Sequence, residues 1–143
     1  MNYLHQNSLV QTHLDDMYRR KGNKIATFAT DLPEEAYCDN WIAQNGIDLL
    51  DRCPDDQPWF LQINFTGPHD PWDVTHRMKA TYAEIGFPSP FPFSRFSAEE
   101  HNQVRQNYSA MVENIDRWLG VYVDLLQDRG QLENTLIVFS SDH

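Results

Sequence analysis

The apolar positions of this 143-residue chain change their spacing along its length, and the spacing indicates which segments are strands. Residues 59–65 form a nearly continuous apolar run that follows Pro58 and ends at a Thr-Gly-Pro turn. Residues 135–140 form a second apolar run that is rich in β-branched side chains. Short runs of this kind are typical of strands buried on both faces. The pattern therefore predicts two buried strands.

Helical spacing lies between the two predicted strands. Residues 97–100 read Ser-Ala-Glu-Glu, which is a capping box and predicts a helix start. Apolar side chains then recur at intervals of three and four as far as Gly130, a good residue for a helix end. The members of this stripe are Val104, Tyr108, Met111, Val112, Ile115, Leu119, Tyr122 and Leu126.

A strand, a helix and a second strand in this order predict a parallel βαβ unit, whose connection should be right-handed. Another helix is predicted from about Glu34 or Asp39 to Arg52, ahead of the first strand. Residues 1–31 show no clear pattern. The fold class predicted from the pattern is α/β, with a parallel βαβ unit and flanking helices.

Length and charge limit the classes of protein that need to be considered. The 143 residues suffice for one domain with a continuous core. The formal net charge of −10 argues against partners such as nucleic acid or an anionic membrane, which select clustered Lys and Arg. No apolar run approaches a membrane span, and the first residues lack the features of a signal peptide.

The last two residues follow directly on the second predicted strand. Open α/β sheets place functional residues in the loops after their strands, so a natural domain seldom stops there. We therefore expect residues 1–143 to be a single fragment of a catalytic domain. Further sequence or another chain, as in an oligomer, would supply the missing parts of the domain.

A constrained loop follows the first predicted strand and carries His69. Pro68 and Pro71 flank this histidine, so its imidazole should be held with little freedom at the edge of the sheet where ligands bind. A histidine held in this way is a candidate general acid or hydrogen-bond donor near neutral pH. The alternative is a loop histidine whose ring only bonds to the backbone.

Asp142 and His143 are candidate ligands of a divalent metal ion. A carboxylate and an imidazole suit such an ion but need further ligands, and they can converge only where the chain leaves the strand. Asp15 and Asp16, with His13 beside them, also resemble a metal pair. They follow no predicted strand, so we interpret them as a solvated surface.

Four stretches of the chain share the order and approximate spacing of one enzyme family. The stretches are residues 32–52, 58–71, 108–120 and 132–143, which include the His69 loop and the Asp-His ending. Over most of residues 32–143 the chain thus resembles the sulfatases of the alkaline phosphatase superfamily. The resemblance implies a partial alkaline-phosphatase-like fold and the hydrolysis of a small sulfated substrate.

The resemblance also implies a role for each candidate residue. His69 matches a histidine that contacts the ester group and helps to protonate the leaving oxygen. Asp142 and His143 match ligands of the family's divalent cation, which is commonly Ca²⁺. An imidazole in the second position suits Mn²⁺ or Zn²⁺ better than Ca²⁺.

One feature of the family does not occur in this sequence. Sulfatases carry a Cys-x-Pro-x-Arg motif, or a Ser version of it, whose first residue is oxidised to a formylglycine nucleophile. Cys38 is followed two residues later by Asn40, and Cys53 by Asp55, so neither cysteine fits. We therefore expect the formylglycine to lie outside this chain, and the chain alone to be inactive.

Two other interpretations stay open at this point. The first is a phosphonate monoester hydrolase or phosphodiesterase of the same superfamily, where the Asp-His ending also occurs. The second is a non-catalytic α/β binding module, in which His69 is structural and the acidic surface serves solubility.

Overall fold

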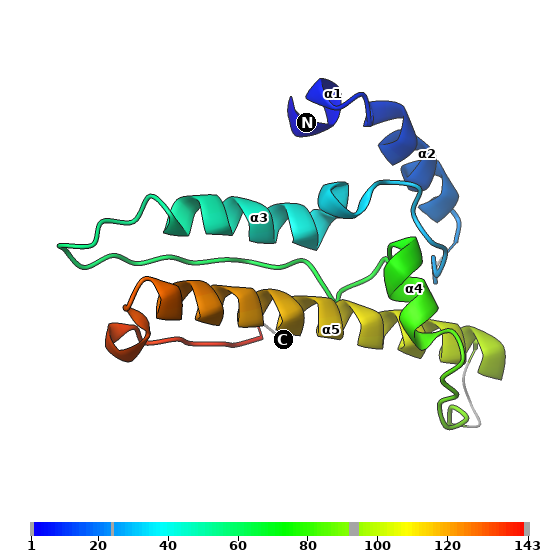
Figure 1. Ribbon diagram of the computed structural model, residues 1–143. Coiled ribbons are helices and arrows are strands. Elements are labelled where there is room, and N and C mark those ends of the chain that lie inside the picture. Colours follow the sequence, from blue (N-terminus) through cyan, green and yellow to red (C-terminus); the bar gives the residue numbers. More distant parts are fainter. Residues whose placement is uncertain (1, 24, 92–94, 142–143) are drawn as a thin grey trace.

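The computed structural model describes residues 2–23, 25–91 and 95–141 and shows a mainly helical arrangement (Figure 1). The helices are α1 (Asn2–Gln6), α2 (Val10–Arg20), α3 (Cys38–Leu50), α4 (His76–Tyr82) and α5 (Ala98–Asp128). Two short 3₁₀ turns, Glu34–Ala36 and Leu132–Asn134, precede α3 and follow α5. No helix in this part of the chain has both the length and the apolar character that crossing a membrane requires.

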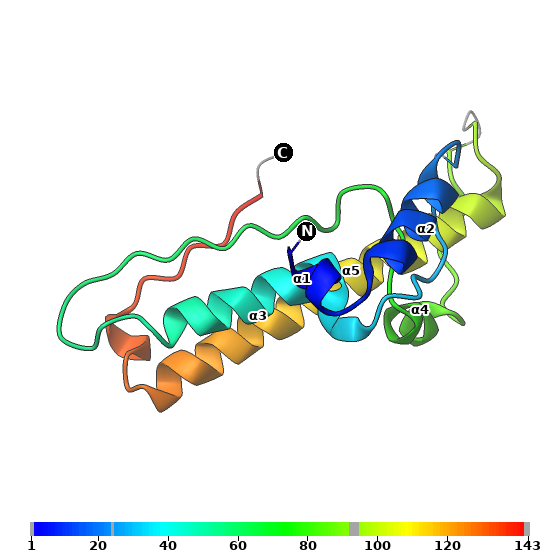
Figure 2. The same cartoon turned by 90° about the horizontal axis from the view of Figure 1, so that it is seen from above.

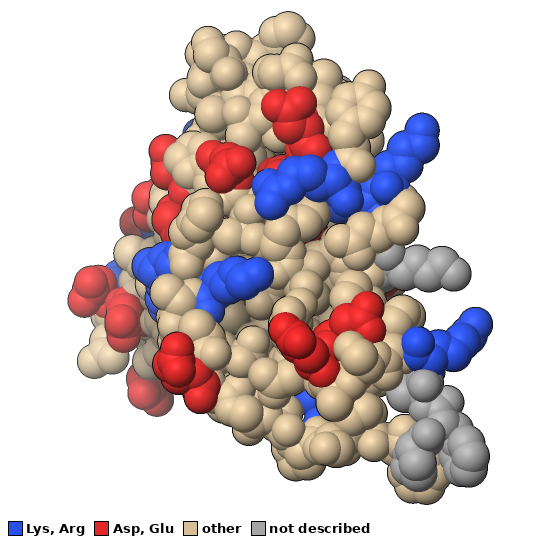
Figure 3. All heavy atoms as spheres, turned by 90° about the vertical axis from the view of Figure 1, so that its right-hand side faces the viewer, with Lys and Arg blue, Asp and Glu red and all other residues tan. Residues whose placement is uncertain are grey.

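The long helices α3 and α5 lie side by side, and residues 59–65 run along the pair in an extended conformation (Figure 2). The short helix α4 packs against α5. On the side of the molecule drawn in Figure 3, basic and acidic side chains are interspersed. The negative net charge is therefore not gathered there into a field of one sign.

The predicted α/β fold class, with its parallel βαβ unit, is wrong for the described residues, which are mainly helical and form no sheet. Residues 59–65 and 135–140 are extended but pair with no neighbour, and the one β-bridge described is an isolated parallel bridge between Ala29 and Val74. A strand needs a neighbour that takes up its backbone hydrogen bonds, whereas an apolar run reports only on burial and conformation. Several side chains of these runs are in fact exposed, among them Phe60 and Leu136 at 88% each and Val138 at 77%.

The predicted helix start at Ser97 and helix end at Gly130 are both confirmed. The Ser97 hydroxyl accepts a hydrogen bond from the Glu100 N–H at 3.2 Å, and the Glu100 carboxylate accepts one from the Ser97 N–H at 2.7 Å. At the other end Gly130 has a φ of +65° and donates to the Gln127 carbonyl, while the next N–H donates to the Leu126 carbonyl. This pattern is a Schellman motif, so local chemistry defines both ends of α5.

Close packing between α3 and α5 centres on a glycine. A Cβ atom on Gly46 would lie 2.2 Å from the Tyr122 Oη atom and 2.7 Å from the Ile63 Cδ1 atom. The Tyr122 hydroxyl donates a hydrogen bond to the Ala43 carbonyl at 2.5 Å, so it is not free to move aside. Leu50 is 1% exposed in the same contact. The glycine thus sets how closely the two helices approach.

Gly46→Ala should therefore lower the free energy of unfolding by about 1–3 kcal/mol, because the extra methyl group overfills a packed contact. Urea unfolding followed by circular dichroism measures the change. Gly120→Ala on α5 is the matched control, since nothing lies within 4 Å of its Cβ position. Alanine there should stabilise the helix by about 0.5–1 kcal/mol. Equal stability changes in the two variants would contradict the packing argument.

Candidate functional site

A buried carboxylate of α3 holds the loop that carries His69. Asp39 is 1% exposed and lies in the first turn of α3, where the helix dipole favours a negative charge. One of its oxygens accepts hydrogen bonds from the Thr66 N–H at 2.7 Å and the Thr66 hydroxyl at 2.8 Å. The other accepts from the Gly67 N–H at 3.1 Å. Three donors thus tie the start of the loop to one helix.

The loop approaches the helices so closely that only glycine fits at position 67. A Cβ atom on Gly67 would lie 2.5 Å from the Asp39 Oδ2 atom and 3.3 Å from the Met111 Cε atom of α5. The peptide bonds before Pro68 and Pro71 are both cis. The sequence stretch that flanks His69 therefore packs directly onto α3 and α5.

The His69 side chain lies on the outside of this loop, and its side chain is 60% exposed. Its Nδ1 atom is 2.7 Å from the Asp70 carbonyl oxygen and 2.9 Å from the Asp70 Oδ1 atom. Because both neighbours are acceptors, Nδ1 carries the ring proton that they bond. The ring is thus oriented by Asp70.

A buried tyrosine, Tyr37, is close to the carboxylates of Asp39 and Asp73. Tyr37 is 7% exposed, and its hydroxyl donates a long hydrogen bond of 3.5 Å to the Asp73 carbonyl. Burial, followed by the negative charges of Asp39 and Asp73, raises the pKa of Tyr37 above its ordinary value. Burial also raises the pKa of Tyr122 to about 12. Both phenols are thus neutral in the folded state at neutral pH.

Stability should consequently fall in alkaline solution. The folded state favours the neutral phenol, so this contribution is complete below the ordinary tyrosine pKa of 10.0 and is lost as pH rises through about 12. Urea midpoints measured at about pH 8 and about pH 11 should show the decrease, and tyrosinate absorbance should appear together with unfolding. Tyr122→Phe should reduce the difference between the two midpoints. A midpoint that stays constant across this range would contradict the assignment.

The solvated-surface interpretation is wrong for Asp16. Its side chain is buried at 1% exposure and accepts a hydrogen bond from the Thr30 hydroxyl at 2.5 Å. The Arg19 Nη1 atom lies 3.1 Å from its other oxygen. Asp15 is exposed and accepts a hydrogen bond from Gln11. Asp16 therefore ties α2 to the segment that follows it.

The two candidate metal ligands Asp142 and His143 lie outside the described residues. Within the described part of the chain, no three side chains of the ligating types His, Cys, Asp and Glu gather around one point. Neither Cys38 nor Cys53 forms a disulfide bond. The structure thus describes the surroundings of His69 but not those of the predicted metal ligands.

Comparison with known proteins identifies a sulfatase family model and relatives that are described as sulfatases. The family model described as Sulfatase matches residues 1–143. An arylsulfatase from Clostridium perfringens is 25% identical over 129 aligned residues, which cover 77% of this chain and 27% of that protein. A choline-sulfatase from Rhizobium meliloti is 27% identical over 158 residues, covering 91% of this chain and 31% of that protein.

A third relative has a broader description. The multifunctional alkaline phosphatase superfamily protein PehA from Trinickia caryophylli is 24% identical over 166 residues, covering 90% of this chain and 32% of that protein. The chain thus spans between 27% and 32% of the length of these three relatives.

Proposed function

The chain belongs to the sulfatase family, and from this premise we propose that it supplies the general acid for hydrolysis of a small sulfate ester. The observation that carries the proposal is the His69 loop, which α3 anchors through Asp39 and which orients the imidazole through Asp70. The sulfatase relatives support a hydrolase of this type.

The proposed step follows from the geometry of the imidazole. When the ester bond between sulfur and the leaving oxygen breaks, that oxygen takes up negative charge and needs a proton. Protonated His69 would deliver it from Nε2, while the Asp70 carboxylate at 2.9 Å from Nδ1 holds the ring in its orientation. After transfer, the neutral ring keeps its Nδ1 proton on the two Asp70 acceptors.

We further propose that Asp142 and His143 belong to a divalent cation site of the complete protein. Their carboxylate and imidazole donors fit Mn²⁺ or Zn²⁺, and Ca²⁺ with additional oxygen ligands. When bound, such a cation would offset negative charge on the ester oxygens. The formylglycine nucleophile of the family has no matching residue here, so the proposal places it outside residues 1–143.

The substrate class is tested with the protein expressed from its complete reading frame. Nitrophenyl sulfate should be hydrolysed with a higher kcat/KM than nitrophenyl phosphonate or phosphate esters. The 143-residue chain assayed alone with added metal should give no turnover above buffer. Turnover by the chain alone would contradict the assignment of the nucleophile to other residues.

A phosphonate monoester hydrolase or phosphodiesterase is the second candidate function. The chain is similar to PehA, which is described as a multifunctional protein of the alkaline phosphatase superfamily, so the test includes phosphorus esters. A higher kcat/KM on the phosphorus esters would establish this candidate in place of the sulfatase. Absence of turnover on every ester by the complete protein would instead favour a binding module.

A further inference from the structure

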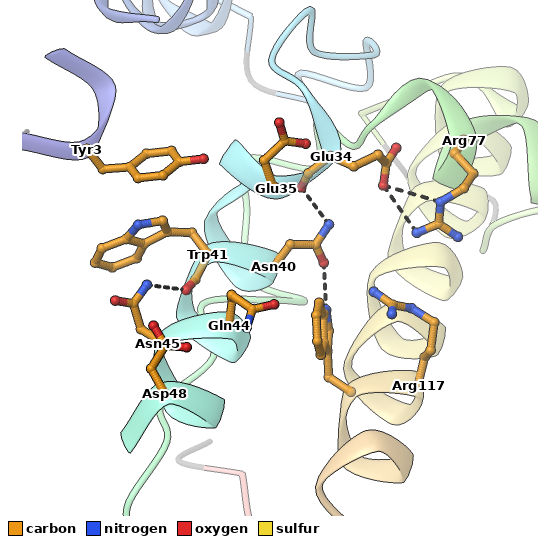
Figure 4. A pocket seen from close by; sticks show the side chains of 11 residues that line it. Tyr3, Glu34, Glu35, Asn40, Trp41, Gln44, Asn45, Asp48, Arg77 and Arg117 are labelled. Atoms are coloured by element: carbon orange, nitrogen blue, oxygen red, sulfur yellow. Dashed lines mark hydrogen bonds and ion pairs between the residues drawn. The ribbon is translucent and has the colours of Figure 1, made fainter. Parts of the chain in front are cut away.

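A pocket of about 550 Å³ opens between α1, α3 and α5, close to the first turn of α3 (Figure 4). Its lining on α3 comes from Asn40, Trp41, Gln44, Asn45 and Asp48. Positions 40, 41, 44, 45 and 48 fall on one face of a helix with about 3.6 residues per turn. The volume suits a small organic ligand.

This face of α3 points away from the His69 loop. Asp39, which binds the loop, and Gly46, which contacts the residue 59–65 segment, lie on the opposite face of the same helix. The pocket is therefore separated from that loop by the body of α3. None of the residues used by the proposed proton transfer lines it.

Aromatic side chains form part of the pocket wall. The rings of Tyr3 and Trp41 are tilted by 59° with centroids 6.3 Å apart, and Trp41 is 40% exposed. Trp118 of α5 also lines the pocket, and its Nε1 donates to the Asn40 Oδ1 atom at 2.7 Å. Asn40 in turn donates to the Glu34 carbonyl at 2.8 Å, so the Trp118 ring is fixed in place. The pocket thus offers preset apolar ring surfaces.

Two arginines lie at the other side of the pocket, and only one of them is paired (Figure 4). Arg77 bonds the Glu34 carboxylate through two nitrogens at 3.2 Å each. Arg117 forms no ion pair with any described residue; it donates to Asn114 and lies 4.4 Å from the Trp118 ring centroid. A guanidinium has five N–H donors, so Arg117 can accept an anionic ligand group.

Further polar side chains line the pocket, and they include the carboxylates of Glu35 and Asp48. The exposed side chains of Gln44 and Asp48 line the pocket on the side of Trp41, away from the two arginines (Figure 4). An amide and a carboxylate there can bond several hydroxyl groups of one ligand. A ligand that satisfies all three features has an apolar C–H face, several hydroxyls and an anionic group at one end.

We propose that this pocket binds a carboxylated sugar of the hexuronate type. Arg117 holds the carboxylate, the Trp41 and Tyr3 rings contact the C–H face of the sugar, and Asp48 and Gln44 bond its hydroxyls. A ligand with only an aromatic ring and an acid group would leave the polar side of the pocket unused. The proposal does not depend on the reaction at His69.

The test is calorimetric titration of the chain with glucuronate, glucose and cyclohexanecarboxylate. Glucuronate should bind with a Kd on the order of 1 mM, and glucose and cyclohexanecarboxylate each at least about fivefold more weakly. Arg117→Gln should weaken glucuronate binding about tenfold and leave glucose binding unchanged. Asp48→Asn should weaken the binding of glucose, and that of glucuronate by a smaller factor, because the substitution also removes a negative charge that repels the carboxylate. The exposed Arg52 and Asp51 provide the matched controls Arg52→Gln and Asp51→Asn, which should change neither.

Circular dichroism verifies that each variant keeps its helix content, and all four substitutions lie at exposed positions. Equal binding of glucuronate and cyclohexanecarboxylate would overturn the sugar assignment, because the hydroxyls would then contribute nothing. Equal effects of Arg117→Gln and Arg52→Gln would overturn the site. Absence of saturable glucuronate binding up to about 50 mM would overturn the proposal altogether.

Discussion

Replacing His69 with alanine in the complete protein is expected to slow the hydrolysis of alkyl sulfates by about 10²–10⁴-fold. Hydrolysis of nitrophenyl sulfate should fall much less, because nitrophenolate is a good leaving group that departs without a proton. The measurement is kcat/KM for both esters in the wild-type and variant proteins at one pH. The ratio of the two losses isolates the proton transfer from any general damage to the fold.

His76→Ala provides the control for this experiment. His76 is an exposed histidine of α4 whose Nε2 atom lies 3.3 Å from the Asp31 carboxylate, outside the loop that carries His69. Removal of the His76 side chain should leave kcat/KM for both esters unchanged. If His69→Ala reduced both reactions by the same factor, His69 would bind or position the substrate and would not act as the acid.

The Asp39→Ala variant should lose about 2–4 kcal/mol of unfolding free energy, the range expected when buried donors lose a charged acceptor. Asp39 accepts hydrogen bonds from the Thr66 and Gly67 N–H groups, and removing it leaves these donors without their acceptor. Urea unfolding measures the loss. Asp39→Asn should lose less, because its amide oxygen can still accept one of the bonds. Amide hydrogen exchange at residues 66 and 67 should accelerate in both variants.

Asp51→Ala is the control on the same helix, since Asp51 is exposed. It should stay within about 0.5 kcal/mol of the wild type. Unchanged exchange at residues 66 and 67 in Asp39→Ala would show that the loop does not depend on this carboxylate.

The long helix α5 could be predicted because residues close to one another in the sequence define each of its ends. Ser97 and Glu100 cap each other, and Gly130 takes the positive φ that closes the helix, so a few neighbouring residues contain the whole signal. The prediction for α3 placed its start at Glu34 or Asp39. Glu34 begins a 3₁₀ turn and α3 itself begins at Cys38, so both alternatives had a structural counterpart.

The unpaired state of residues 59–65 and 135–140 and the burial of Asp16 and Asp39 could not be predicted in the same way. Pairing of residues 59–65 or 135–140 depends on a distant neighbour that the apolar pattern does not identify. Asp39 is recognisable from the sequence only as a first-turn acid, and its partners are 27 and 28 residues away. Asp16 bonds Thr30, 14 residues away, so its burial also depends on tertiary structure.

The contacts that join α3 to α5 have a kinetic consequence. Asn40 bonds Asn114 and Trp118 across 74 and 78 residues, and Ala43 bonds Tyr122 across 79. Closing loops of this length costs chain entropy before any contact energy is gained, and folding rates fall as contacts become less local. We therefore expect the chain to fold more slowly than helical proteins whose contacts are mostly local. Its helices can form within about a microsecond, whereas their docking has to wait for the two ends of the loop to meet.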